Sequence, residues 1–225
     1  MTAVIAFDVN ETLLDLRVLD QPFEELLGDS NLRQLWFAQM LQLSFVGGLT
    51  GHYVDFRRAQ EAALRMVAER VGMVVGSSTI SHMVDRMNSL PPHSEVPTAL
   101  ERLAATDLKV VALVNSLLEV GEKQLTNAGV RGHFDSVISA DAVRHLKPSP
   151  EPYQRVADEY GVPIHEVRLV AAHSWDISGA LAAGCRAAFI SRPGMVLSPL
   201  GEQPDIVATD IADAVDQIIA TDLVR

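Results

Sequence analysis

Charged and polar residues that could carry chemistry gather at a few places in this sequence, each just after a short apolar run. Asp8 ends the run formed by residues 3–7, and Asn10, Glu11 and Thr12 follow it closely. An ionised carboxylate at the end of a buried strand must be hydrogen-bonded or paired, because burying a lone charge is costly. A fixed cation nearby would keep Asp8 ionised and therefore nucleophilic.

Lys147, in the segment HLKPSPEPY, is our candidate for that cation. It follows another apolar run, residues 136–138, so both side chains would stand beyond the ends of strands. Parallel strands of one sheet present their carboxyl ends at the same edge, and we therefore predict that Lys147 pairs with Asp8. As alternatives, Asp8 could cap a turn or a helix, and Lys147 could be an ordinary surface lysine.

The elements that would position these residues are those of a parallel α/β sheet. Short apolar runs without alternation are typical of strands buried on both faces, and helical pattern or short loops separate them here. We predict a doubly wound, Rossmann-like parallel sheet. Its strands are expected within six segments: residues 3–7, 108–114, 136–138, 167–171, 187–190 and 206–207.

Residues 15–93 have a different sequence pattern from the rest of the chain. Its apolar residues fall at helical spacing over most of its length, and two successive prolines, Pro91 and Pro92, close it. We predict a helical cap domain over residues 15–93, inserted after the first strand, and an α/β core domain made of residues 1–14 and 94–225. A cap in this place would lie beside the loop that carries Asp8.

Composition narrows the choice of partners. The 225 residues include 18 Lys plus Arg and 29 Asp plus Glu, which gives a formal net charge of -11. Such a surface repels nucleic-acid phosphates and anionic lipids, so we expect neither as a partner. Cys185 is the one cysteine, which excludes an internal disulfide. No export signal or membrane span is recognisable, and we expect a cytoplasmic protein.

Four motifs, in order along the chain, carry a resemblance to a known family. They are FDVNETLLD at the start, VNS after the second run, KPSPEPY, and AAHSWD after the fourth. In this order they resemble the haloacid dehalogenase superfamily over essentially the whole chain. Within that superfamily the pattern most resembles the type II 2-haloacid dehalogenases. It resembles in particular a subgroup whose sequences carry NET, WF and AAH, as this chain does at residues 10–12, 36–37 and 171–173.

This resemblance implies a reaction. Asp8 would displace halide from the α-carbon of a short 2-haloacid, such as a haloacetate or 2-halopropionate, and form an ester. Water would then hydrolyse that ester and release the 2-hydroxyacid. The resemblance also implies the (S) isomer as substrate, no metal or other cofactor, and a homodimer formed through the cap helices.

His173 and Glu11 are the candidates for activating that water. His173 stands where the better-known type II enzymes have Asn, and Glu11 comes from a loop that could reach it. A histidine oriented by a carboxylate is a competent general base near neutral pH. The alternative is structural: Glu11 would cap the next segment, and His173 would be a hydrogen-bonded core residue.

The remaining motif residues receive roles from the same resemblance. Asp176 is expected to orient Lys147, although it could also cap a helix. Thr12 would hydrogen-bond Asp8 or cap the following turn. Tyr153 and Trp175 would line the substrate pocket, and simple packing is the alternative for each.

Two positions depart from the better-known type II enzymes. Phe37 stands where they have an arginine that holds halide and substrate, and Val114 replaces a serine or threonine. The loss of an arginine and a hydroxyl favours a weak or narrow activity. The substrate carboxylate is then expected to bind Asn115 and the loop formed by Val9, Asn10 and Glu11.

Two other functions remain open at this point. A magnesium-dependent phosphatase of the superfamily would have a second Asp as its general acid, and this chain has Asn10 there. A vestigial member that only binds small carboxylates would be consistent with Phe37 and Val114. The intact set Asp8, Lys147, His173 and Asp176 argues against a vestigial member and favours the dehalogenase.

Overall fold

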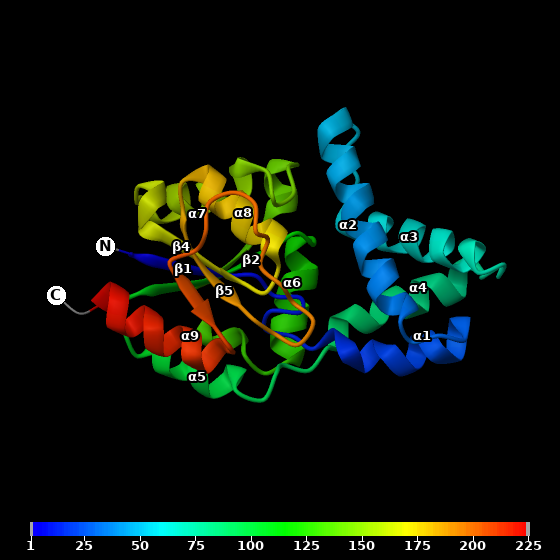
Figure 1. The fold of residues 1–225 in the computed structure, drawn as a ribbon, viewed down its shortest axis with the longest axis horizontal. Helices are drawn as coiled ribbons and strands as arrows, with labels where there is room; N and C mark the ends of the chain where they lie inside the picture. Colours follow the sequence, from blue (N-terminus) through cyan, green and yellow to red (C-terminus); the bar gives the residue numbers. More distant parts are fainter. Residues whose placement is uncertain (1, 224–225) are drawn as a thin grey trace. The chain divides into compact units, whose positions relative to one another are not determined.

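The computed structural model describes residues 2–223 and separates the chain into two compact units (Figure 1). The first joins Met1–Asp15 to Pro91–Arg225, and the second is Leu16–Leu90. The chain therefore leaves the first unit just after its first strand and returns at the pair of prolines.

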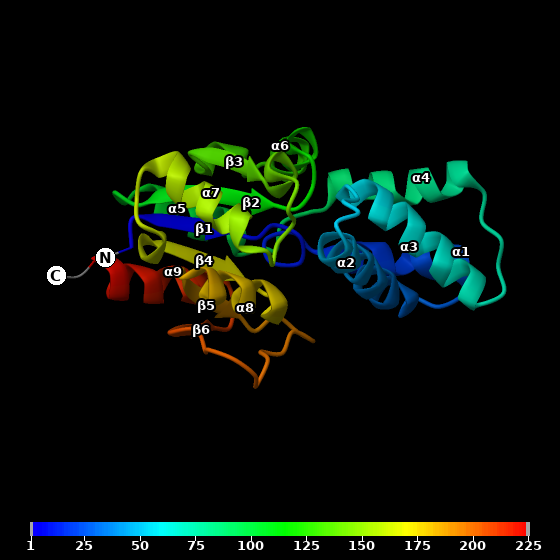
Figure 2. The same ribbon diagram turned by 90° about the horizontal axis from the view of Figure 1, so that it is seen from above.

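The first unit is built on a parallel sheet of six strands, seen side by side in Figure 2. Their order is β3-β2-β1-β4-β5-β6. The predicted doubly wound sheet is confirmed, since each of the six predicted segments overlaps one strand, and the ends agree to within one residue. The strands are β1 (Val4–Phe7), β2 (Lys109–Val114), β3 (Ser136–Ser139), β4 (Val167–Ala171), β5 (Arg186–Ile190) and β6 (Ile206–Ala208).

Helices cover both faces of this sheet. α7 and α8 lie against one face, and α5 and α9 pack together on the other (Figure 1). Layers on both sides explain why the inner strands are apolar along their length instead of alternating. The helices are α5 (Val96–Ala104), α6 (Leu118–Asn127), α7 (Pro150–Tyr160), α8 (Ser174–Ala183) and α9 (Ile211–Ile218).

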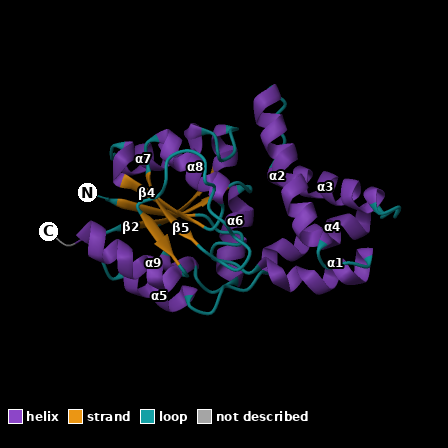
Figure 3. Cartoon of the chain, in the orientation of Figure 1, coloured by secondary structure: helices purple, strands orange, loops and turns teal. Residues whose placement is uncertain are grey.

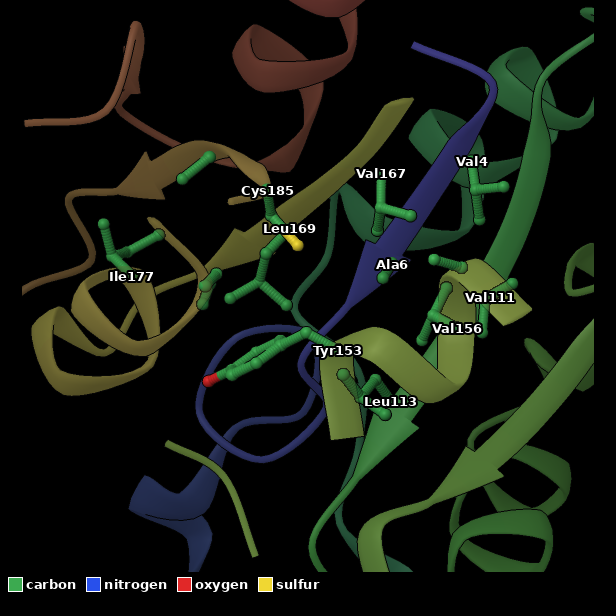
Figure 4. Close-up of a cluster of buried hydrophobic side chains, with 14 of the residues drawn as sticks. Val4, Ala6, Val111, Leu113, Tyr153, Val156, Val167, Leu169, Ile177 and Cys185 are labelled. Carbon is green, nitrogen blue, oxygen red and sulfur yellow. The ribbon is translucent and has the colours of Figure 1, made fainter. Parts of the chain in front are cut away.

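The core beneath α7 and α8 is a continuous apolar cluster (Figure 4). Val4 and Ala6 of β1 meet Leu169 of β4 and Val156 of α7 there. Burial of each such aliphatic side chain stabilises the fold by roughly 1.5–3 kcal/mol. This layer fixes the strand ends relative to α7 and α8.

The second unit is entirely helical (Figure 3). Trp36 is buried in it, and its indole N–H donates to the carbonyl of Gln60 at 2.9 Å. Among the described helices, none is both long enough and apolar enough to cross a bilayer. The helices are α1 (Asp20–Leu27), α2 (Leu32–Thr50), α3 (Phe56–Arg70) and α4 (Ser77–Asp85).

A buried ion-pair network ties the end of the chain to the sheet. Arg168 of β4 is fully buried, and its Nε lies 2.7 Å from Oδ2 of Asp222. Its Nη1 lies 2.6 Å from Oδ1 of Asp205, just before β6. Arg186 of β5 adds a third contact, 3.1 Å from Asp222. Without Arg168, the carboxylate of Asp222 would stay buried with one partner.

We predict that Arg168→Met lowers the free energy of unfolding by about 3–5 kcal/mol, because it leaves a buried carboxylate under-compensated. Urea unfolding followed by circular dichroism measures the change. Arg155→Ala is the control, since Arg155 pairs with Glu159 on an exposed helix surface and the loss there should stay below about 0.5 kcal/mol. Equal losses in the two variants would contradict the prediction.

Candidate active site

The candidate site lies where the strand order reverses. From β1 the chain proceeds to β2 and β3 on one side, and to β4, β5 and β6 on the other. Asp8 directly follows β1, and its backbone N–H donates to the carbonyl of Val170 in β4 at 3.0 Å. Ligands of open α/β sheets bind beyond the carboxyl ends of the strands at such a reversal.

Asp8 is surrounded by donors on both carboxylate oxygens. Lys147 Nζ lies 2.9 Å from Oδ1, and the Thr12 hydroxyl donates to Oδ2 at 2.7 Å. His173 Nδ1 lies 3.2 Å from the same Oδ2. The side chain is 10% exposed, so these three groups largely replace water around it.

Lys147 is held in place from several directions. Its side chain is 1% exposed, and Nζ lies 2.6 Å from Oδ2 of Asp176. The other oxygen of Asp176 accepts from the Tyr153 hydroxyl at 2.6 Å. The Asn115 amide hydrogen-bonds the Lys147 backbone twice: it accepts from the N–H at 2.8 Å and donates to the carbonyl at 3.3 Å. The ammonium therefore has one fixed position, between two carboxylates.

Burial and charge act in opposite directions on these groups. Burial alone would raise the pKa of Asp8, but Lys147, His173 and Thr12 together hold that pKa well below its usual value. The pKa of Asp176 is raised by burial and by the charge of Asp8. The pKa of Lys147 is raised, because the two carboxylates outweigh its burial. Asp8 is thus an ionised carboxylate and Lys147 a permanent cation.

His173 bridges two carboxylates. Its Nε2 lies 2.9 Å from Oε2 of Glu11, while Nδ1 faces Asp8. Burial disfavours the imidazolium, but the bonds to Asp8 and Glu11 outweigh burial and raise the pKa of His173 to about 10. The ring of Trp175 lies 5.3 Å from the imidazole, centroid to centroid. In the resting protein His173 is therefore a cation.

The loop after β1 is a tight turn with one unusual residue. Glu11 has a φ of 62°, the left-handed region that non-glycine residues rarely occupy. The carbonyl of Val9 accepts from the N–H groups of Leu13 and Leu14, and Asn10 Oδ1 accepts from Gln124 of α6 at 3.0 Å. Strain of this kind persists where the surroundings impose it, and here it directs the Glu11 side chain toward His173.

A family model for haloacid dehalogenase-like hydrolases matches residues 53–190 of the chain. The chain belongs to this family. It is 30% identical to (S)-2-haloacid dehalogenase from Pseudomonas sp. (strain YL), over 94% of this chain and 92% of that one. It is 29% identical to haloacetate dehalogenase H-2 from Moraxella sp. (strain B), over 96% and 97%.

Solved structures of related enzymes superpose on this hydrolase. L-2-haloacid dehalogenase from Xanthobacter autotrophicus has a TM-score of 0.92 at 27% identity, covering 99% of this chain and 100% of that one. The structure of the Xanthobacter enzyme with chloropropionic acid covalently bound has a TM-score of 0.91 at 26% identity, with the same coverage.

Within the hydrolase, the structure brings Asp8, Glu11, Thr12, Lys147, His173 and Asp176 into one hydrogen-bonded group. Three side chains predicted to bind substrate make contacts within the protein. Tyr153 is buried in the core and donates to Asp176, and the Asn115 amide is engaged with Lys147. Val114 packs toward Gly121 of α6, where a Cβ on the glycine would lie 3.0 Å from the valine.

Trp175 and Phe37, also predicted to contact the substrate, lie in different units of the structure. Trp175 stacks near His173, with its ring centroid 5.9 Å from Lys147 Nζ. Phe37 belongs to the helical unit, where its ring meets Trp36 at a centroid distance of 6.4 Å. Among residues 2–223, no group of three or more His, Cys, Asp or Glu side chains is arranged to hold a metal ion.

The structure adds residues that the sequence reasoning missed. Gln124 and Arg192 bond the loop that follows β1. Ser116, next to Asn115, is 6% exposed, and its hydroxyl has no hydrogen-bond partner among the described residues. No motif marks Gln124 or Arg192. Ser116 belongs to the VNS motif after the second predicted strand, but the sequence assigned it no role of its own.

The charge of His173 can be tested directly. We predict that ¹⁵N-labelled His173 keeps its proton at about pH 8, and that Asp8→Asn lowers its pKa because one compensating carboxylate is lost. The stability linked to this group should be fully present below its ordinary pKa of 6.5 and be lost as pH rises toward 10. Nuclear magnetic resonance titration measures the pKa, with the exposed Asp216→Asn as control. A neutral imidazole at pH 8 in the unsubstituted protein would contradict the assignment.

Proposed function

We propose that this hydrolase removes the halogen from short-chain (S)-2-haloacids, such as haloacetates and 2-halopropionate, through an ester formed on Asp8. The observation that carries the proposal is the Asp8 carboxylate at the end of β1, which is ionised, largely buried and paired with Lys147. Related chains bear the names (S)-2-haloacid dehalogenase and haloacetate dehalogenase, which supports the same substrate class here.

In the first step an oxygen of Asp8 attacks the α-carbon of the substrate. A carbon–oxygen bond forms, the carbon–halogen bond breaks, and the halide leaves with the bonding electron pair. Lys147 and Thr12 orient the carboxylate for this displacement. The Xanthobacter structure with covalently bound chloropropionic acid supports an adduct of this kind.

Esterification also changes the state of His173. The ester has no negative charge, so the attraction that Asp8 exerts on the imidazolium disappears, while the desolvation that disfavours the charge remains. We propose that His173 then releases its Nδ1 proton to solvent. It becomes a neutral base, held by Glu11 through the other nitrogen.

In the second step, water attacks the ester carbonyl of Asp8, and His173 takes a proton from that water. The imidazolium returns a proton to the departing alkoxide, which yields the 2-hydroxyacid. The carboxyl group of Asp8 then gives its proton to His173, and the starting ion pair is restored. His173 thus loses one proton to solvent after halide release and regains one from the attacking water. The catalytic groups therefore end in their starting protonation states, and the net reaction releases one proton and one halide.

The substrate carboxylate needs donors near Asp8. The Asn115 amide donates to the Lys147 carbonyl, and the aliphatic side chain of Val114 offers no donor. We propose that the buried hydroxyl of Ser116 donates to this carboxylate, alongside the backbone N–H groups of Val9 and Asn10. The N–H of Glu11 is not included, because it donates to the Leu14 carbonyl at 2.9 Å. A hydroxyl buried without a partner at the carboxyl end of β2 is the supporting observation.

Single-turnover hydrolysis of chloroacetate in ¹⁸O water tests the ester. We expect one labelled oxygen in the peptide that carries Asp8 and none in the first-turnover glycolate, because water attacks the carbonyl of the ester. Mass spectrometry locates the label. Label confined to the product would contradict an ester on Asp8. Turnover of p-nitrophenyl phosphate with Mg²⁺, in place of halide release, would favour the phosphatase alternative.

His173→Asn supplies the second arm of that experiment. This variant should still release halide once per site, then stop with alkylated Asp8, since it lacks the base for hydrolysis. The slowing of the second step is expected to be about 10²–10⁴-fold. Full turnover at the unsubstituted rate would remove His173 from the mechanism.

We further predict that Ser116→Ala raises KM for chloroacetate about tenfold, with a smaller effect on kcat, because it removes one hydrogen bond to a charged group. Steady-state halide release measures both constants. Ser178→Ala is the matched control. Ser178 is exposed on α8, and its hydroxyl donates to the Ser174 carbonyl of the same helix. An unchanged KM in Ser116→Ala would contradict this role.

A further inference from the structure

Arg192 is a buried cation that contacts the loop carrying the nucleophile. It follows β5 and is 8% exposed. Its Nε and Nη2 both donate to the backbone carbonyl of Thr12, at 2.9 and 2.7 Å. Nη2 also lies 2.7 Å from Oε1 of Glu95, at the start of α5. A buried guanidinium with two bonds to one carbonyl fixes the position of that peptide group.

Thr12 links this contact to the reacting carboxylate. The threonine is fully buried, and its hydroxyl donates to Asp8 at 2.7 Å. The same hydroxyl accepts from the N–H of Ala172, just after β4, at 2.9 Å. Its proton is therefore directed to Asp8, because the other side of the oxygen faces a donor.

The backbone around Arg192 is itself anchored. The N–H of Ser191 donates to Ala208 of β6 at 2.8 Å, and the N–H of Met195 donates to the Arg192 carbonyl at 2.8 Å. β4 lies between β1 and β5 in the sheet, so the guanidinium crosses the end of β4 to reach Thr12. The loop after β1 is thus tied to the ends of two further strands.

We infer that Arg192 is a positioning residue for the displacement step, fixing Thr12 so that its hydroxyl aims the Asp8 carboxylate at the substrate carbon. The inference builds on the proposed function and adds a residue that does not touch the substrate. The loop holds Glu11 in the left-handed region, so it needs contacts from outside to keep its shape. Misplacing a reacting group by about 1 Å can cost about 10²-fold in rate.

A double-mutant cycle between Arg192 and Thr12 tests this inference through halide release. We expect Arg192→Ala to lower kcat about 30-fold and to change KM less than threefold, since the loss is in orientation of the nucleophile. If Arg192 acts through Thr12, then Thr12→Ala combined with Arg192→Ala should be no slower than Thr12→Ala alone. Multiplying effects would show a purely structural role and overturn the inference.

Two further variants keep the result interpretable. Arg192→Lys should recover activity to within about fivefold of the unsubstituted protein, because an ammonium can still donate to the Thr12 carbonyl. If Arg192→Ala does not fold, the cycle is run with Arg192→Lys and its smaller effect. Glu95→Gln is the matched control: it weakens the second partner of Arg192 and leaves the bonds to Thr12, so kcat should stay near its unsubstituted value. A loss in Glu95→Gln equal to that in Arg192→Ala would overturn the role through Thr12.

A readout independent of turnover separates this inference from the proposed function. The Nδ1 resonance of His173 reports on the Asp8 carboxylate, and Arg192→Ala and Thr12→Ala should shift it in the same direction without additive effects. Failure of the unsubstituted protein to release halide would refute the proposed function alone. An unshifted resonance, or unchanged kcat in an active enzyme, would refute the role of Arg192.

Discussion

The ammonium of Lys147 is the charge on which the rest of the site depends. It is almost wholly buried between Asp8 and Asp176, and both of these carboxylates have little water around them to stabilise their charge. Asn115 fixes its backbone, and Tyr153 and Asp176 fix its head. Residues that follow four strands at one sheet edge therefore act together to keep the Asp8 carboxylate both desolvated and anionic.

Charge balance explains how an acidic protein can receive an anionic substrate. Three acidic side chains, those of Asp8, Glu11 and Asp176, face two basic ones, Lys147 and His173, so the acidic excess is one group here, against a formal net charge of -11 for the chain. In the proposed reaction, esterification removes one negative charge, and the loss of the proton from His173 removes one positive charge. The site thereby stays near the same net charge in both halves of the cycle, which limits the electrostatic cost of either step.

The sequence allowed the sheet to be predicted strand by strand, because runs such as residues 167–171 are apolar without alternation and end in polar loops. The sequence also allowed us to predict that Asp8 pairs with Lys147, since both residues follow parallel strands. The hydrogen bonds of the Tyr153 and Asn115 side chains were not predictable, because no sequence pattern marks the partner toward which each side chain turns. Arg192 was missed for the same reason: one arginine after a strand has no pattern, and its role exists only once the ends of β1, β4 and β5 lie together.

Glu11 shows that the needs of folding and of chemistry differ at one position. A φ of 62° suits glycine, whose lack of a Cβ removes the steric conflict, yet the carboxylate that bonds His173 must come from this residue. Selection for stability alone would therefore favour loss of the side chain here, and selection for the proposed reaction would oppose it. If a related chain lost the proposed activity, glycine at position 11 would stabilise this turn. On the proposed mechanism, the residue type at position 11 therefore indicates whether a relative still uses its histidine as a base.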